Sequence, residues 1–430
     1  MRGLLRQPDS GAAPLTATKP LSRARVVLAA SVGNALEWFD LLVFGYLSGP
    51  ISSQFFPSGN EVASVLATFA TFAVAFAARP LGAAVLGAYA DRHGRTKALT
   101  LAVALMTLGT AIIAFTPTFH QIGPAATVIL VVARLIQGFS AGGEFGSATA
   151  FLAEQNPARR GFYASWQVAS QGFATLLGAG FVGVLTAMLA PADLQGWGWR
   201  IPFLFGLLLG PVSLYIRWYV PESPEYHAAD HSATPLRETL GTQKRRLLVA
   251  MGLIVLPTVL TYINLFMPGY AIREFGIPAN AAFFASFITG AVQLTTAPIF
   301  GALSDRYGRL KVMAPGAVAM LVLVYPLYLW LQATPTLAAM LTLQAFSGLV
   351  LASYFGPAPS VMAELFPVRV RTTGLSLGYN LAVPLFGGLA PFLITWLIAA
   401  SGDKLAPGYY VAFASAVGLV ALLGARRLRA

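Results

Sequence analysis

Apolar residues in this chain come in long continuous runs, and short polar loops separate one run from the next. About twelve of these runs reach the roughly 20 residues that are needed to cross the hydrocarbon core of a bilayer. The runs cover residues 24–52, 61–88, 97–116, 124–151, 161–189, 199–219, 247–272, 280–302, 311–331, 336–361, 373–400 and 408–425. They lack the alternation of a membrane β-barrel, so the pattern predicts an all-α membrane protein with twelve transmembrane helices.

Composition supports a membrane protein and limits the chemistry of its sites. Of the 430 residues, 57% are hydrophobic and 10% are charged, against about 25% charged in soluble domains. The chain has no cysteine and four histidines, so we expect no disulfide, no metal site and no cofactor. Residues 1–23 are polar and contain Pro8, Pro14 and Pro20; we expect a cytoplasmic tail there, without a cleavable signal.

The net charge of +12 reflects the topology of the chain in the membrane. When both ends are placed in the cytoplasm, most of the 28 Lys and Arg residues fall on the cytoplasmic side. This is the positive-inside bias of membrane proteins, so the basic balance does not point to nucleic acid. The exceptions are Arg200, Arg273 and Lys404, which fall on the outer side, and Arg79 and Arg134, which lie within apolar runs.

Two segments of the first half of the chain recur in the second half. "GAYADRHGRTK" (87–97) returns as "GALSDRYGRLK" (301–311), and "AEQNPAR" (153–159) returns as "AELFPVR" (363–369). We therefore expect two homologous halves of six helices, 24–219 and 247–425. A cytoplasmic linker (220–246) joins them, and a cytoplasmic tail (426–430) follows. Two parallel repeats around a central cavity are the plan of many secondary transporters.

The repeated Gly-x-x-x-Asp-Arg-x-Gly-Arg loop resembles the signature of the major facilitator superfamily, and "RLIQGFSAGGE" (134–144) and "PESPEY" (221–226) resemble further motifs of it. Other segments resemble its metabolite:proton symporter family. They are "GNALEWFD" (33–40), "ARPLGAAVLG" (78–87), "GFSAGGEFG" (138–146), "SWQVASQ" (165–171) and "GWGWRIPF" (196–203). "SGDKLAPGYY" (401–410), "TTGLSL" (372–377) and "FGGLAP" (386–391) further resemble the citrate and tricarballylate branch.

The resemblance implies the major facilitator fold, with twelve helices in two pseudo-symmetric bundles, and a monomer in a bacterial inner membrane. It implies a proton symporter that imports a small carboxylate, with citrate or a related di- or tricarboxylate as the first expectation. Proline or betaine, 2-oxoglutarate and shikimate are the alternatives within the family. A channel would not need the duplicated loops, and the sequence offers no nucleophile or metal cluster for an enzyme.

Acidic residues in the first apolar run indicate a site for protons. A charge in mid-membrane costs at least about 2.5–3.5 kcal/mol, so it must be paired, protonated or in a wet cavity. Glu37 and Asp40 share one helical face, and we expect Asp40 to pair with Arg134. The resemblance implies that Asp40 and Arg134 couple transport to protons, whereas a static ion pair is the alternative for both acids. Arg134, Gln137 and Glu144 lie along one helical stripe, and Glu144 is either a second proton site or a brace for Arg134 or the inner gate.

Other polar residues within the runs are candidates for substrate binding. Arg79 could anchor a carboxylate through bidentate donors or pair with Glu37 or Asp40, and the resemblance favours the substrate. Gln167 and Gln171 share a face and line either a cavity or a helix–helix contact. The candidates in the second half are Tyr262, Asn264, Tyr270, Gln293, Tyr354, Tyr379 and Asn380.

The repeated loops predict a gate. The resemblance implies that their charged residues latch the two halves when the cytoplasmic side is closed. The residues in question are Asp91, Arg92, Arg95, Asp305, Arg306 and Arg309, with Glu154 and Glu364 before the repeated Pro-x-Arg segments.

Overall fold

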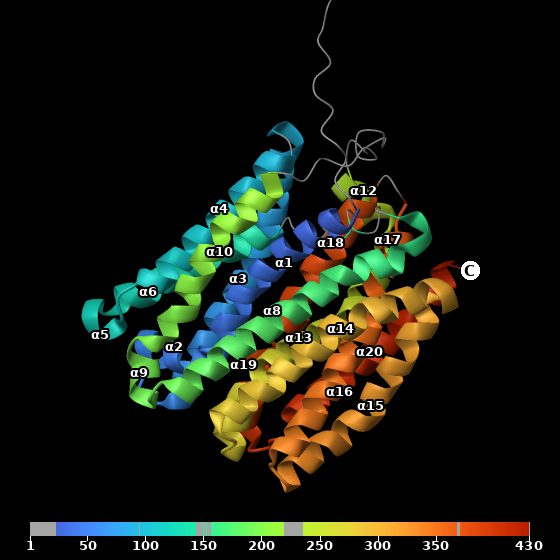
Figure 1. Cartoon of the computed structure of the whole chain (residues 1–430). Coiled ribbons are helices and arrows are strands. Elements are labelled where there is room, and N and C mark those ends of the chain that lie inside the picture. Colours follow the sequence, from blue (N-terminus) through green and yellow to red (C-terminus); the bar gives the residue numbers. More distant parts are fainter. Residues whose placement is uncertain are drawn as a thin grey trace, which may run out of the picture.

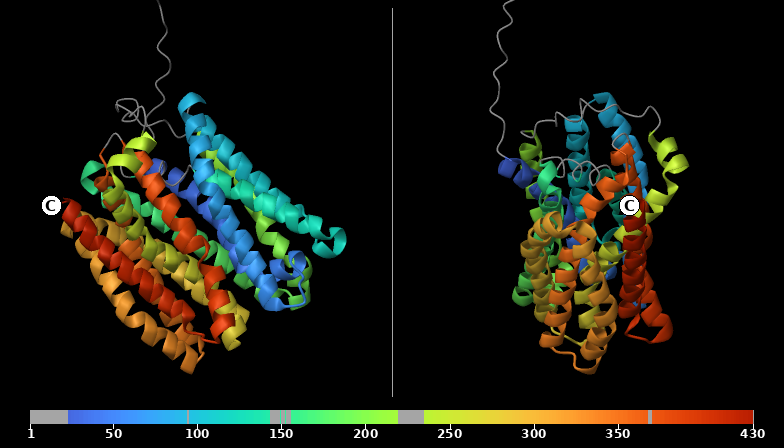
Figure 2. Two further views of the ribbon diagram at one scale, coloured as in Figure 1. Left: turned by 180° about the vertical axis from the view of Figure 1, so that it is seen from behind. Right: turned by 90° about the vertical axis from the view of Figure 1, so that its right-hand side faces the viewer.

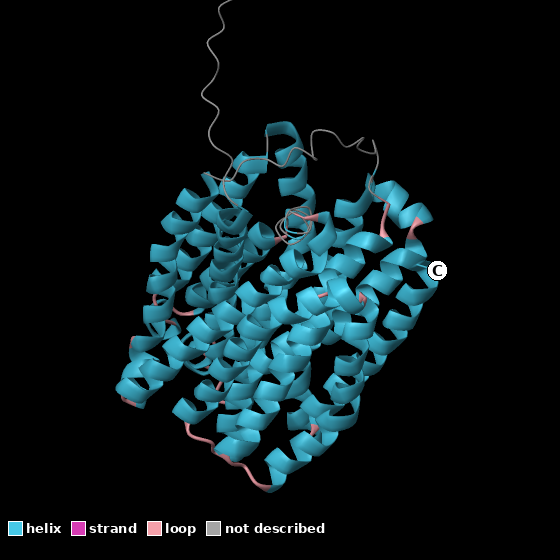
Figure 3. Cartoon of the chain, turned by 45° about the vertical axis from the view of Figure 1, so that its right-hand side comes forward, coloured by secondary structure: helices cyan, strands magenta, loops and turns pink. Residues whose placement is uncertain are grey.

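The computed structural model describes residues 23–93, 95–142, 149, 152, 156–218, 235–367 and 370–429. Throughout these ranges the chain is built of helices joined by short loops, and none of the described residues forms a strand (Figures 1 and 3). The predicted all-α architecture is confirmed.

The first half contributes six long segments, which are α1 (Arg23–Tyr46), α3 (Glu61–His93), α4 (Arg95–Phe115), α6 (Pro124–Ala141), α8 (Arg160–Met188) and α10 (Ile201–Trp218). Short elements connect them: α2 (Ser48–Phe55), α5 (Phe119–Ile122), α9 (Pro191–Gly196) and the 3-10 turns η1 (Pro157–Arg159) and η2 (Gly198–Arg200).

The second half repeats the plan after the short helix α12 (Pro235–Thr242), which lies in the predicted linker. Its continuous long helices are α13 (Lys244–Phe275), α14 (Ala279–Tyr307), α15 (Arg309–Ala333) and α20 (Ala406–Arg429). Its two interrupted segments pair α16 (Leu337–Phe355) with α17 (Ala358–Leu365), and α18 (Arg371–Ala382) with α19 (Ala390–Ser401). The π-helical turn η4 (Val383–Gly388) lies between α18 and α19.

Nine helical segments of the described ranges are long and apolar enough to cross a membrane. Two shorter apolar segments, Thr100–Phe115 and Gly198–Leu208, occupy the places predicted for the third and sixth crossings. With α1, whose apolar run carries the two acids, these segments account for the twelve helices expected from the hydrophobic pattern.

The two halves lie side by side, with α8 of the first half running along α14 of the second (Figures 1 and 2). Glycines allow this contact. A Cβ atom built at Gly290 on α14 would lie 2.6 Å from the carbonyl oxygen of Gly172 on α8. Gly161 and Gly301 face each other in the same way nearer one end of the two helices. Small residues let helix backbones approach closely in lipid, so this seam fixes the spacing of the halves.

Candidate functional site

A narrow pocket in the first half collects four of the predicted residues, Glu37, Asp40, Arg79 and Arg134. The other lining residues are Leu41, Ala75, Phe76, Met106, Gln137, Gly138 and Ala141. The pocket encloses about 20 Å³, which is room for a water molecule but not for a metabolite. A substrate could therefore enter only after the surrounding helices have moved apart.

Asp40 is buried on α1, with 7% of its surface exposed. The hydroxyl of Thr110 on α4 donates a hydrogen bond to Asp40 Oδ2. Asp40 Oδ1 has no hydrogen-bond partner among the described residues, and the backbone of Gly206 on α10 lies directly against it. One oxygen of this buried carboxylate therefore accepts a hydrogen bond from a hydroxyl. The other oxygen contacts a glycine and can still accept a hydrogen bond.

Arg134 does not pair directly with Asp40 among the described side chains, although we expected an ion pair. Its Nη1 donates to Gln137 Oε1 at 2.8 Å, and Gln137 Nε2 donates to Thr110 Oγ1 at 3.0 Å. Thr110 then donates to Asp40. Each donor in this chain points toward the carboxylate, so the bonds polarise one another in a low-dielectric interior.

Both buried guanidinium groups rest on aromatic rings. The Cζ atom of Arg134 lies 4.2 Å from the ring centroid of Phe44 and 5.4 Å from that of Phe72. The Cζ atom of Arg79 lies 4.4 Å from the ring centroid of Phe76. A cation over a ring face is stabilised by about 0.5–2 kcal/mol without using a hydrogen bond. Arg134 accordingly keeps Nε and Nη2 without a hydrogen-bond partner among the described residues.

Two tyrosines bring the second half to this site. The ring of Tyr262 on α13 lies 5.2 Å from Phe76 and 6.3 Å from Trp38, measured between centroids. Its hydroxyl is buried and has no hydrogen-bond partner among the described residues. Tyr379 on α18 lies close to Arg79. The predicted residue Tyr262 and the arginine therefore meet where the two halves face each other.

The predicted glutamines of α8 lie outside the pocket. Gln167 Oε1 accepts a hydrogen bond from Thr149 at 2.5 Å, and its backbone carbonyl accepts one from Asn34 of α1 at 3.2 Å. Gln167 thus takes part in helix–helix contacts, the second of the two alternatives. Both amide atoms of Gln171 are buried without a hydrogen-bond partner among the described residues.

Three further candidates in the second half hold helices together. Asn264 accepts a hydrogen bond from Ser347 at 2.8 Å, and Tyr354 donates to the carbonyl of Gly418 at 3.4 Å. Asn380 of α18 donates to the carbonyl of Gly142, at the end of α6, at 3.2 Å. None of these three lines the pocket, and their binding of a substrate stays a prediction.

Thr110, Gln137 and Tyr379 also belong to the site. Gln137 was predicted on one helical stripe with Arg134, three residues away, and Tyr379 was a candidate lining residue of the second half. Thr110 was not predicted, because nothing distinguishes it from other threonines in apolar runs.

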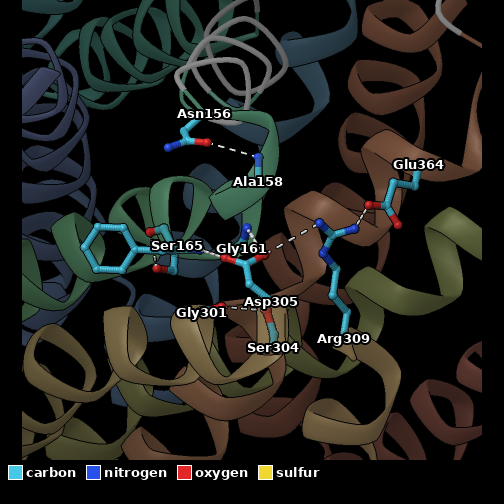
Figure 4. Close-up of polar contacts among 10 residues, drawn as sticks. Asn156, Ala158, Gly161, Ser165, Gly301, Ser304, Asp305, Arg309 and Glu364 are labelled. Atoms are coloured by element: carbon cyan, nitrogen blue, oxygen red, sulfur yellow. Dashed lines mark hydrogen bonds and ion pairs between the residues drawn. The ribbon is translucent and has the colours of Figure 1, made fainter. Parts of the chain in front are cut away.

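A second cluster joins the halves where α8 begins and α14 ends (Figure 4). Asp305 at the end of α14 accepts hydrogen bonds from the backbone N–H groups of Gly161 and Phe162, at 2.8 and 2.9 Å. These groups begin α8, where the helix dipole favours a negative charge. Arg309 pairs with Glu364 on α17 and lies 3.7 Å from Asp305.

Three of the predicted gate residues, Asp305, Arg309 and Glu364, thus lie together. The guanidinium of Arg306 instead lies over the ring of Tyr307, with Cζ 5.3 Å from its centroid. Some predicted residues lie outside the described part of the structure. They are Glu144 and Glu154, and the side chains of Asp91, Arg92 and Arg95.

The chain matches two family profiles and several relatives. The "Sugar (and other) transporter" profile matches residues 26–240, and the "Major Facilitator Superfamily" profile matches residues 249–429. Over 411 residues the chain is 36% identical to a citrate-proton symporter of Klebsiella pneumoniae, covering 95% of this chain and 93% of the relative. It is 32% identical to a proline/betaine transporter of Escherichia coli (strain K12), covering 92% of this chain and 82% of the relative.

The crystal structure of a D-xylose-proton symporter has the same fold. It superposes with a TM-score of 0.74 at 20% identity, covering 93% of this chain and 96% of that one. The chain therefore belongs to the major facilitator superfamily. It is a multi-pass membrane transporter and not an enzyme, and the predicted family and its twelve-helix fold in two bundles are confirmed.

The substitution Thr110→Val tests the hydrogen-bond chain to Asp40. We expect it to lower the free energy of unfolding by about 1–3 kcal/mol, because a buried carboxylate loses its donor. Thr107→Val is the matched control, since the Thr107 hydroxyl bonds to the Val103 carbonyl of its own helix. Thermal unfolding in detergent measures both variants. Equal midpoints for the two would contradict the contact.

The substitution Asp305→Asn tests the contact between α14 and α8. The chain has no cysteine, so Ser165→Cys, at a fully buried position of α8, gives a single thiol. We expect Asp305→Asn to speed labelling of this thiol about tenfold, because hydrogen bonds to a charged acceptor contribute about 1.5–3 kcal/mol.

The control for this labelling experiment is Asp193→Asn, an exposed position of α9 at the opposite end of the molecule (Figure 1). The control should label as slowly as the parent protein. An unchanged labelling rate in Asp305→Asn would show that this carboxylate does not hold the halves together.

Proposed function

We propose that this protein imports a small organic acid with two or three carboxylates together with protons, and that citrate is its first candidate substrate. The observation that carries the proposal is the pair of guanidinium groups, Arg79 and Arg134, buried on aromatic rings beside two acidic residues. The identity to citrate-proton symporters over nearly the whole chain supports the same substrate class.

Arg79 is the proposed anchor for a substrate carboxylate. It is 6% exposed and stands where the first half meets Tyr262 and Tyr379 of the second half. A guanidinium binds a carboxylate through two parallel hydrogen bonds, and these are strong where water is excluded. The anion would enter when the halves separate on one side, and its binding would favour their closure.

Asp40 is the proposed proton site, and the chain through Thr110 and Gln137 connects it to Arg134. An ionised Asp40 keeps the hydrogen bonds of Arg134, Gln137 and Thr110 directed toward its carboxylate. When Asp40 takes a proton, its attraction for the chain falls, and Arg134 can turn its unpartnered nitrogens to an anion. Proton and anion then favour each other's binding, as symport requires. Glu37, on the same wall of the pocket, and Glu144 are the further candidates.

The cluster of Asp305, Arg309 and Glu364 is the proposed cytoplasmic latch. The positive-inside bias supports placing this end of the molecule, and both termini, in the cytoplasm of a bacterium. The repeated loop of the first half, with Asp91, Arg92 and Arg95, would form the matching latch, joined by Arg306 and Glu154. We propose a monomer whose halves, 24–219 and 247–425, rock about the pocket while the linker 220–246 joins them.

A zwitterion such as proline or betaine is the second candidate substrate. The rings of Trp38, Phe76 and Tyr262 pack together beside the pocket that Glu37 lines. Aromatic faces attract quaternary ammonium groups, and an acid could complement their charge. The proline/betaine relative supports this candidate at a lower identity than the citrate relatives do.

The substitution Asp40→Asn tests the proton site. We expect proton-driven accumulation of substrate in liposomes to be abolished, because the amide carries no exchangeable charge. Exchange of internal for external substrate should continue, since that process needs no net proton movement. Accumulation against a gradient at the rate of the parent protein would remove Asp40 from the mechanism.

The substitution Arg79→Ala tests the anion site and the substrate class. Binding of citrate, tricarballylate, 2-oxoglutarate, shikimate, proline and betaine is measured by calorimetry on purified protein. We expect citrate or tricarballylate to bind best and Arg79→Ala to weaken binding at least a hundredfold, as removal of a hydrogen-bonded charge pair costs about 2–5 kcal/mol.

The exposed residue Arg245 provides the control substitution, Arg245→Ala, which should bind like the parent protein. Normal carboxylate affinity in Arg79→Ala would give Arg79 a purely structural role. Binding of proline or betaine in place of the carboxylates would favour the second candidate.

A further inference from the structure

The eleventh membrane segment changes its helical form at the level of the pocket. Between α18 and α19 the turn η4 is π-helical, a form that occurs mostly as single turns inside α-helices and is frequent at functional sites. Pro384 lies within it and removes one backbone donor. The hydroxyl of Tyr410 on α20 donates to the carbonyl of Phe386 at 2.9 Å, so a neighbouring helix stabilises the altered turn.

The last two residues of this turn are glycines that touch the aromatic rings of the site. A Cβ atom built at Gly388 would lie 2.7 Å from Phe76 Cδ2, 2.8 Å from Cγ and 3.0 Å from Cβ. At Gly387 an added Cβ would overlap the ring of Tyr262 and the methyl group of Thr258. Both glycines are buried. The backbone of Gly387 and Gly388 therefore packs directly against the two rings, with no space for an added methyl group. We call this surface of η4 the seat.

The two rings that pack on the seat, those of Phe76 and Tyr262, also determine where Arg79 lies. Phe76 carries the guanidinium of Arg79 on its face, and Tyr262 packs edge-on against Phe76. Phe76 belongs to α3 of the first half, whereas η4 and Tyr262 belong to the second. The contact between Gly388 and Phe76 consequently links the spacing of the halves to the position of the arginine.

We propose that Gly387 and Gly388 are positioning residues that set the place of the carboxylate-binding arginine through Phe76 and Tyr262. The proposal rests on the proposed function, in which Arg79 binds a substrate carboxylate. A methyl group at position 388 forces the Phe76 ring away from the second half, and Arg79 moves with the ring on which it rests. Overpacking of this kind costs about 1–3 kcal/mol in a tight interior.

A double-mutant cycle tests whether Gly388 acts through Phe76. We expect Gly388→Ala to weaken citrate binding, measured by calorimetry, at least tenfold. In a Phe76→Ala background, which removes Cγ and Cδ2 and keeps only the Cβ atom at 3.0 Å, the same substitution should change affinity less than twofold. Gly378→Ala on α18, where an added Cβ meets Ala250 at 3.2 Å and no ring of the site, should bind like the parent protein.

Equal losses in the two backgrounds would show that Gly388 does not act through Phe76, and unchanged binding in Gly388→Ala would show that the seat does not position the arginine. Either result overturns the inference while leaving the proposed function intact. A parent protein that binds none of the carboxylates would instead overturn the proposed function.

A cross-linking experiment decides the contact without any substrate. The Cβ atom built at Gly388 lies 3.0 Å from Phe76 Cβ, slightly closer than the separation of about 3.5–4.5 Å in disulfides, so a small shift of the backbone brings the pair into range. We expect the pair Phe76→Cys and Gly388→Cys to form a disulfide when copper phenanthroline removes two electrons and two protons from the thiols. The pair Phe76→Cys and Gly378→Cys should stay reduced. Failure of the first pair to cross-link would contradict the seat.

Discussion

The constraint on which this structure depends is the cost of keeping charged groups inside a bilayer. An uncompensated charge in mid-membrane costs several kcal/mol, yet Asp40, Arg79 and Arg134 are each more than nine-tenths buried. The first half holds them with two devices. Aromatic faces from α1 and α3 carry the guanidinium groups, and a directed chain through Thr110 supports the carboxylate. Both devices leave atoms without a hydrogen-bond partner among the described residues, such as Asp40 Oδ1 and Arg134 Nη2. These atoms are free to bind new partners in the proposed transport cycle.

The contact between the two halves also depends on glycine, because glycine lets parts of the two halves approach without side chains between them. Gly172 and Gly290 bring α8 and α14 together along a seam, and Gly388 brings η4 against Phe76. Small residues of this kind let helix backbones approach closely where no hydrophobic effect drives them together. The charged cluster around Asp305 lies at one end of this seam, where it adds hydrogen bonds and an ion pair to the contact between the halves.

The fold could be predicted from the sequence because its main determinants are local features of the chain, namely the apolar runs and the two repeated loops. Asp40, Arg79 and Arg134 could be found for a similar reason, since a charge inside an apolar run is conspicuous. Thr110 could not, because a threonine in a helix satisfies its hydroxyl within its own turn, as Thr107 does. The indirect link from Asp40 to Arg134, and the ring seat of η4, depend on side-chain directions that only packing determines.

The central claim is that these buried charges couple a carboxylate to protons, and proton movement tests it most directly. Purified protein in weakly buffered liposomes, with no imposed gradient, is given external citrate while a dye reports the external pH. The account predicts that the medium becomes more alkaline as citrate enters, and that a protonophore abolishes the change. Entry of citrate without any alkalinisation would contradict the account.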